Sequence, residues 1–190
     1  MENQYLQILR DVLENGHTRE TRNYQTKSMF GKCISFDLAN GFPILTTKKV
    51  FFRGVVEELS WFLRGSTDAK ELIAKNVHIW DGNSEKNNYD CGPIYGFQWR
   101  HYGAKYIDCQ TDYSGCGVDQ VQNVIDLLKN DPTSRRIIIN AWNPKQMEEM
   151  GFRVKDGVRE DYNVYDMRFV KYCNVFFVQL RSPGYIGKAW

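Results

Sequence analysis

Apolar residues recur at helical spacing in three stretches of the chain. The first covers residues 3–15, before the stop signal Asn15-Gly16; the second is Phe52–Leu63, and the third is Asp119–Lys129. Recurrence at i, i+3, i+4 and i+7 gathers apolar side chains on one face of a helix. The pattern predicts three amphipathic helices. It adds shorter ones at Asp68–Lys75 and Lys145–Met150.

Other stretches have the patterns of strands and loops. Ser28–Leu38 alternates apolar and polar residues, and Ile44–Thr47 adds a short extended piece. Arg135–Trp142 is a β-branched run typical of a buried strand, and Cys173–Leu180 is a continuous apolar strand candidate. Trp80–Gly117 is rich in Gly, Asn, Asp, Tyr and Trp with weak periodicity, which predicts long surface loops. No linker or repeat interrupts residues 1–190, so we expect a single domain.

Composition narrows the class of protein. The chain is 42% hydrophobic and 25% charged, and it has no run of eighteen apolar residues that could cross a bilayer. A net charge of +2, with no basic cluster, argues against a specific nucleic-acid partner. The N-terminus lacks a secretory pattern. We therefore expect a soluble protein of the cytoplasm, with the nucleus as the alternative compartment.

The five cysteines are scattered and none forms a CxxC pair. An odd number without pairing argues against a disulfide framework and against a zinc site. The sequence therefore predicts free thiols and no metal.

Four ordered stretches resemble the thymidylate synthase family, which includes the deoxycytidylate hydroxymethylases. They are Gly41–Lys49, Glu57–Gly65, Gly92–Arg100 and Ser134–Pro144, within a resemblance that covers about residues 3–150. The resemblance implies an α/β (α+β) mixed-sheet sandwich of the thymidylate synthase type and a homodimer. It also implies reductive methylation of dUMP to dTMP, with 5,10-methylene-tetrahydrofolate as co-substrate and no metal.

An arginine pair, Arg135-Arg136, opens the predicted buried strand. By pattern alone such a pair is more often solvated, although guanidinium groups suit phosphate because they donate two parallel hydrogen bonds. The resemblance implies that the pair reaches the nucleotide phosphate of the partner subunit. It also implies that Arg22 grips the phosphate of its own subunit, although Asn23–Lys27 replaces the usual Gly/Thr-rich run there.

Glu58 lies between Val56 and Leu59 in an apolar helix, beside Glu57. The pattern fits either a surface carboxylate or a buried one, whose pKa would be raised so that it could pass protons near neutral pH. The resemblance implies the second role and places Tyr95 near the pyrimidine. It further implies that Lys48 meets the glutamate tail of the folate, and that Ile79 and Trp80 stack on the folate rings. Without the resemblance, the pattern predicts that Trp80 packs in the core.

The family's Pro-Pro-Cys-His nucleophile motif is not found about twenty residues after the arginine pair. One register places Asp161–Val164 at the nucleophile position and makes Arg181-Ser182 a further phosphate ligand. A second register inserts about eighteen residues and makes Cys173 the thiolate candidate, although a buried strand cysteine is the alternative. In both registers the chain ends at Trp190, before the family's base-reading segments.

Two other functions remain open at this point. The chain is a truncated or inactive homologue that binds nucleotide or lends its arginine pair to a full-length subunit, or it is a deoxycytidylate hydroxymethylase. The four matched stretches resemble the synthase more closely.

Overall fold

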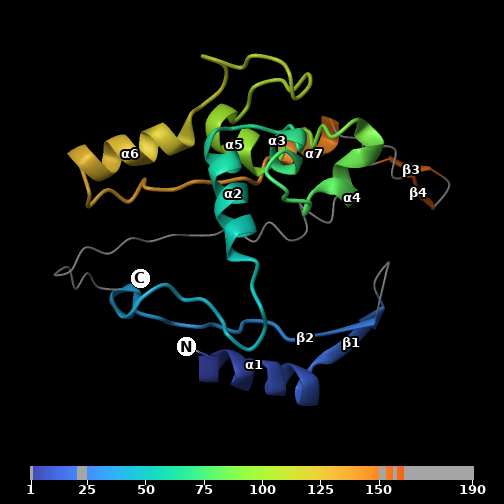
Figure 1. The fold of residues 1–190 in the computed structure, drawn as a ribbon, viewed down its shortest axis with the longest axis vertical. Helices are drawn as coiled ribbons and strands as arrows, with labels where there is room; N and C mark the ends of the chain where they lie inside the picture. Colours follow the sequence, from blue (N-terminus) through green and yellow to red (C-terminus); the bar gives the residue numbers. More distant parts are fainter. Residues whose placement is uncertain (1, 21–24, 150–152, 156–157, 161–190) are drawn as a thin grey trace. The chain divides into compact units, whose positions relative to one another are not determined.

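The chain forms two compact units, Met1–Phe52 and the residues from Arg53 onward. The computed structural model describes residues 2–20, 25–149, 153–155 and 158–160, shown in colour in Figure 1. The expectation of a single domain stays a prediction.

The first unit begins with α1 (Glu2–Asn15), the helix predicted from its spacing. It continues with β1 (His17–Glu20) and β2 (Gln25–Ser28), which pair antiparallel, and with the short 3₁₀ helix η1 (Leu38–Asn40). Among the described side chains of this unit none is fully buried, and Leu13 on the apolar face of α1 is 64% exposed.

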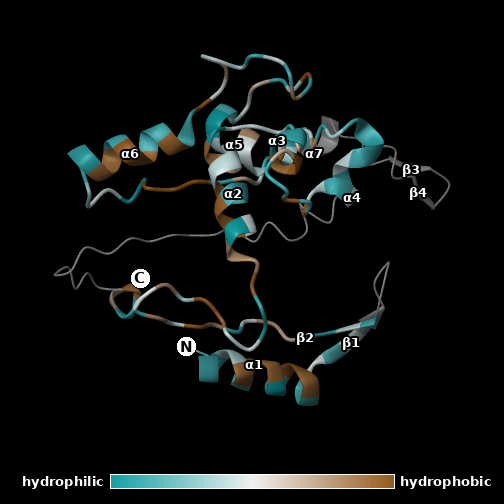
Figure 2. Cartoon of the chain, in the orientation of Figure 1, coloured by the Kyte–Doolittle hydropathy of each residue, from teal (hydrophilic) through white to brown (hydrophobic). Residues whose placement is uncertain are grey.

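The second unit is mostly helical. The predicted helices at Phe52–Leu63 and Asp119–Lys129 are confirmed as α2 and α6. Figure 2 shows apolar and polar residues alternating along α6, as an amphipathic helix requires. The described elements of the second unit are, in chain order, α2 (Phe52–Leu63), α3 (Lys70–Ile73), α4 (Asp81–Ser84), η2 (Glu85–Asn87), α5 (Tyr95–His101), α6 (Gln120–Asn130), α7 (Pro144–Glu149), β3 (Arg153–Lys155) and β4 (Val158–Glu160).

The core of the second unit forms where α2 meets α3 and the segment after it. Trp61 and Val77 are fully buried, and Leu72 is 1% exposed. The Trp61 indole donates from Nε1 to the Asp68 carbonyl oxygen at 3.1 Å, so its polar atom is satisfied. Because α3 is only four residues long, its position depends on these contacts more than on helix propensity.

Helices and small antiparallel sheets occur together in the described residues. The α/β class is therefore confirmed. β3 and β4 form the second antiparallel pair, with Arg153 opposite Glu160.

The predicted strand at Ser28–Leu38 is wrong except for its first residue. β2 ends at Ser28, and β1 is its only partner among the described strands. The backbone N–H of Ser35 donates instead to the Gln4 side chain at 3.3 Å. Alternation of apolar residues makes a strand only where a neighbouring strand accepts its backbone hydrogen bonds.

The predicted buried strand at Arg135–Trp142 is also wrong. Arg135 and Arg136 form a turn, no residue of the segment belongs to a described strand, and Ile138 is 47% exposed. The Gln120 side chain on α6 donates to the Asn140 carbonyl oxygen at 2.8 Å and accepts from the Asn140 backbone N–H at 2.9 Å. A side-chain amide therefore occupies groups that a sheet ladder would use.

Trp80–Gly117 is not simply a run of surface loops. It contains α4, η2 and α5, and its residues Ser84, Cys91 and Phe97 are buried. Each of these helices spans at most seven residues, which is too short to show a clear helical period. Gly96 lets α5 approach α2 closely, because a Cβ there would lie 3.0 Å from the Phe62 Cα.

Candidate functional site

Glu58 on α2 and Trp80 before α4 are joined by a hydrogen bond. The Trp80 indole donates from Nε1 to Glu58 Oε1 at 2.7 Å. Burial raises the pKa of the Glu58 carboxyl, and the bond from Trp80 opposes that rise. A half-buried carboxyl with a raised pKa is suited to proton transfer nearer neutral pH than an ordinary glutamate.

Aromatic rings surround this pair. The Phe62 ring lies 5.2 Å from the Tyr95 ring and 6.0 Å from Trp80, both edge-on, and Trp80 lies 6.4 Å from Tyr95. Trp80 is only 4% exposed, whereas Ile79 beside it is 46% exposed. The structure thus brings Glu58, Tyr95 and Trp80 together, with Trp80 in the core and Ile79 at the surface.

The neighbouring glutamate has a different environment. Glu57 accepts from Lys75 Nζ at 2.6 Å, and this bond lowers the pKa of its carboxyl. The pKa values of these two adjacent carboxyl groups are therefore shifted in opposite directions, and of the two only that of Glu58 is raised. The proton-transfer role that the resemblance implies for Glu58 agrees with this geometry.

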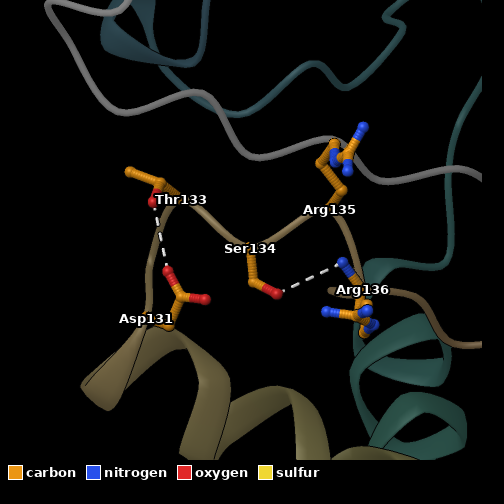
Figure 3. Close-up of a pocket in the computed structure, with 5 residues that line it drawn as sticks. All are labelled: Asp131, Thr133, Ser134, Arg135 and Arg136. Carbon is orange, nitrogen blue, oxygen red and sulfur yellow. Dashed lines mark hydrogen bonds between the residues drawn. The ribbon is translucent and has the colours of Figure 1, made fainter.

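Arg135 and Arg136 line an open pocket of about 460 Å³. The residues that form it come directly after α6 in the sequence. Figure 3 shows the Arg135 side chain extending away from that of Arg136. Ser134 Oγ accepts from the Arg136 backbone N–H at 3.4 Å, and the Thr133 hydroxyl donates to Asp131 Oδ1 at 3.1 Å. Both arginine side chains are exposed, so their donors are accessible to an anion.

Lys48 lies in the first unit, where the backbone bends at Thr47 and Lys48. The Glu2 carboxylate accepts from the backbone N–H groups of Thr46 and Thr47, at 2.8 and 2.7 Å. Lys48 is exposed, directly after these anchored residues.

Four of the predicted site residues lie outside the described residues. They are Arg22, Cys173, Arg181 and Ser182. The two registers proposed for the chain after residue 150 stay predictions.

The described cysteines are free thiols, as predicted. Cys33 and Cys116 are exposed, whereas Cys91 is buried, and burial raises the pKa of its thiol to about 12. A thiol in that state is protonated at neutral pH and is a poor nucleophile. Across the described ranges no group of three His, Cys, Asp or Glu side chains could hold a metal ion. None of the described helices is long and apolar enough to span a membrane.

Sequence reasoning missed several contributors to these sites. Thr133 and Asp131 line the arginine pocket, and Glu2 anchors the bend before Lys48. The turn-forming run Asp131–Ser134 was a usable signal for the pocket, because Asp, Pro and Ser favour turns. Glu2 gave no signal, because it lies 44 residues from its partner.

Comparisons with known proteins agree with the resemblance. The sequence model described as thymidylate synthase matches residues 3–154. The chain is 54% identical over 161 residues to a bifunctional dihydrofolate reductase-thymidylate synthase of Paramecium tetraurelia, covering 78% of this chain and 35% of that protein. It is 51% identical over 159 residues to the thymidylate synthase of varicella-zoster virus, strain Dumas, covering 77% of this chain and 53% of the viral protein.

A bifunctional dihydrofolate reductase-thymidylate synthase of Arabidopsis thaliana is 50% identical over 158 residues, or 77% of this chain and 30% of that protein. The matched part of the chain thus spans about half, or less, of the length of these relatives. Since the family model matches 3–154, most of the 190 residues, the chain belongs to the thymidylate synthase family.

Proposed function

We propose that this chain binds dUMP and a reduced folate and takes part in the reductive methylation of dUMP to dTMP by 5,10-methylene-tetrahydrofolate. The observation that carries the proposal is the Glu58 carboxyl, which is half-buried, has a raised pKa and is hydrogen-bonded to Trp80. It occurs within the part of the chain that matches the family. Tyr95 lies beside Trp80, where it would contact the pyrimidine.

The phosphate of dUMP is assigned to the arginine pair. Arg135 and Arg136 are exposed beside the Ser134 hydroxyl, and guanidinium groups bind phosphate oxygens through charge-assisted hydrogen bonds. In the proposed homodimer this pair binds the phosphate of the nucleotide held by the partner subunit. Arg22, Arg181 and Ser182 complete the proposed phosphate ligands. Asp131 in the same pocket limits the net positive charge there.

The family resemblance assigns the folate to Lys48, Ile79 and Trp80. The exposed Lys48 would meet the carboxylates of the glutamate tail. Ile79 is an exposed apolar residue available to a folate ring. The buried Trp80 would contribute chiefly by holding the carboxylate of Glu58.

The proposed chemistry starts with a thiolate. It adds to C6 of uracil, and C5 becomes nucleophilic and bonds to the one-carbon unit. Loss of the C5 proton and cleavage of the bond to the folate nitrogen leave an exocyclic methylene and tetrahydrofolate. Hydride transfer from tetrahydrofolate reduces the methylene to a methyl group and gives dihydrofolate, while the thiolate leaves C6 and the C5–C6 double bond is restored. Cys173 is the thiolate candidate in the inserted register. Glu58 would exchange protons around the pyrimidine and the folate, which its raised pKa favours.

Turnover of dUMP tests the reaction. The purified chain is incubated with dUMP and methylene-tetrahydrofolate, and dihydrofolate formation is followed by absorbance. We expect Cys173→Ala and Glu58→Gln to abolish or strongly reduce turnover, whereas Glu57→Gln on the same helix leaves it nearly unchanged. Turnover that survives Cys173→Ala would exclude Cys173 as the nucleophile.

Calorimetry tests nucleotide binding independently of turnover. Loss of a charge-assisted hydrogen bond costs about 1.5–3 kcal/mol, so Arg135→Ala and Arg136→Ala should each weaken dUMP binding by about 10- to 100-fold. The same variants should leave deoxyuridine binding unchanged, because it lacks the phosphate. Lys129→Ala, an exposed cation on α6, is the matched control. Unchanged dUMP affinity in Arg22→Ala and in both pair variants would refute the phosphate assignment.

A binding-only function is the second candidate, because the matched residues 3–154 do not include Cys173. It predicts dUMP binding that depends on the arginine pair without dihydrofolate formation. Sedimentation of the chain alone and mixed with a full-length homologue would show whether it forms homodimers or heterodimers.

A further inference from the structure

The Glu2 carboxylate connects the start of α1 to a segment 44 residues away. Oε1 accepts from the backbone N–H of Thr46 at 2.8 Å and of Thr47 at 2.7 Å. Oε2 accepts from the Thr46 hydroxyl at 2.7 Å. Three donors on two consecutive residues thus converge on both oxygens of one side chain, which fixes the direction of the backbone there.

The anchored threonines lead into the bend: Thr46 comes immediately before it, and Thr47 forms it together with Lys48. A lysine side chain is long and flexible, so the region that its ammonium group reaches depends on where the backbone holds its Cα. Ordering a loop before a ligand arrives lowers the conformational entropy lost on binding. A tether on the two residues before Lys48 therefore affects what Lys48 can bind.

The Glu2 side chain is suited to a supporting role more than to direct contact with an anion. Hydrogen bonds from Thr46 and Thr47 lower the pKa of its carboxyl, so it stays ionised at neutral pH. Its negative charge also lies at the N-terminus of a 14-residue helix, where the helix dipole favours an anion. Both oxygens already accept hydrogen bonds, and a free anion would be repelled by the charge.

We infer that Glu2 is a positioning residue for Lys48: by holding Thr46 and Thr47 it sets the bend from which the Lys48 ammonium meets the carboxylates of the folate's glutamate tail. The inference rests on the proposed folate function. Nothing in the sequence pattern distinguishes Glu2 from the other acidic residues of α1, and only the hydrogen bonds reveal it.

The test compares two probes that differ only in the tail. Folic acid carries the glutamate, and pteroic acid lacks it. The wild-type chain should bind folic acid about threefold to fivefold more tightly, the range expected of an exposed charge pair. Lys48→Ala should remove this preference. Glu2→Ala should remove it too, while the affinities for pteroic acid and for dUMP stay unchanged.

Two further variants sharpen the result. Glu2→Gln keeps one acceptor oxygen and loses the charge, so its preference should lie between those of wild type and Glu2→Ala. Glu14→Ala changes an exposed carboxylate at the other end of the same helix, and it should keep the full preference.

Each alternative outcome has a distinct meaning. If wild type prefers folic acid and Glu2→Ala keeps that preference, the inference is overturned and the proposed folate site stands. If wild type shows no preference, the assignment of Lys48 to the tail fails, and the inference fails with it. If Glu2→Ala and Glu2→Gln weaken pteroic acid and dUMP binding as much as folic acid binding, Glu2 is merely structural and the inference is overturned.

Discussion

The bond between Trp80 and Glu58 should have a measurable and pH-dependent coupling energy. Trp80→Phe removes the indole N–H that donates to Glu58 Oε1 at 2.7 Å, and Glu58→Met removes the acceptor while keeping the length of the side chain. Trp80→Phe alone also removes core packing, because the residue is 4% exposed. In a double-mutant cycle that loss occurs in both backgrounds and cancels, which leaves the pairwise term.

The magnitude follows from the charge on the acceptor. A hydrogen bond to an ionised group contributes about 1.5–3 kcal/mol and one between neutral groups about 0.5–1.5 kcal/mol. We therefore expect a coupling energy of about 2 kcal/mol when Glu58 is ionised, which falls to about 1 kcal/mol when it is protonated. Burial raises the pKa of Glu58, so this fall occurs at a higher pH than for an ordinary glutamate.

The same shift fixes the sign of the pH dependence of stability. Between the ordinary pKa of 4.5 and the raised pKa of the folded state, the folded protein binds more protons at Glu58 than the unfolded chain does. The contribution of Glu58 to the free energy of unfolding is therefore greatest below that window and falls as the pH rises through it. Glu58→Met should abolish this component of the pH dependence.

Urea unfolding of the wild type, both single variants and the double variant supplies the cycle, at about pH 7.5 and about pH 4. Circular dichroism follows the helices. A coupling energy below about 0.5 kcal/mol at the higher pH, or one that does not decrease at the lower pH, would refute the reasoning.

Three other perturbations have defined outcomes. Gly96→Ala should lower the free energy of unfolding by about 1–3 kcal/mol, because the new Cβ would lie 3.0 Å from backbone atoms of α2. Asp119→Ala should cost about 0.5–2 kcal/mol by removing the cap of α6, where Asp119 Oδ1 accepts a backbone N–H at 2.9 Å. Iodoacetamide should alkylate the exposed Cys116 of the folded chain and spare Cys91, whose thiol pKa is raised to about 12 by burial.

Each of these measurements has a control. Gly82→Ala adds a Cβ in α4 with nothing within 4 Å, so it should be neutral or stabilise by up to about 1 kcal/mol, and equal effects at both glycines would contradict the packing argument. Asp119→Asn keeps a capping oxygen and should cost less than Asp119→Ala; an equal loss in both variants would assign the effect to the ion pair with Arg100, which both remove. Peptide mass spectrometry after urea unfolding should show Cys91 alkylated, and rapid labelling before unfolding would show that the thiol is accessible.

The sequence by itself predicted the long helices and the family. α1, α2 and α6 extend over eleven residues or more, so their apolar periodicity was sufficient to place them. It also supplied the arginine pair, Glu58 and Lys48 as candidates, because they occur in the motifs that carry the family resemblance. The helices depend on local pattern and the candidate residues on these motifs, and both are present in the chain before it folds.

Strands depended on partners that the local pattern does not contain. Ser28–Leu38 and Arg135–Trp142 have strand-like patterns, but their backbone groups are bound by the side chains of Gln4 and Gln120. The short α5 could not be recognised from periodicity, since it is positioned by its contacts with α2. Hydrogen bonds from distant residues thus outweighed the local preference for a strand.

Tertiary structure decided which of two adjacent glutamates has the raised pKa. Glu57 and Glu58 are the same residue type on one helix, yet Lys75 binds the first and the buried Trp80 binds the second. In the same way, only folding brings Glu2 to Thr46. These partners lie 18, 22 and 44 residues away along the chain. Desolvation and hydrogen bonding depend on such neighbours in space, and a linear pattern does not contain them.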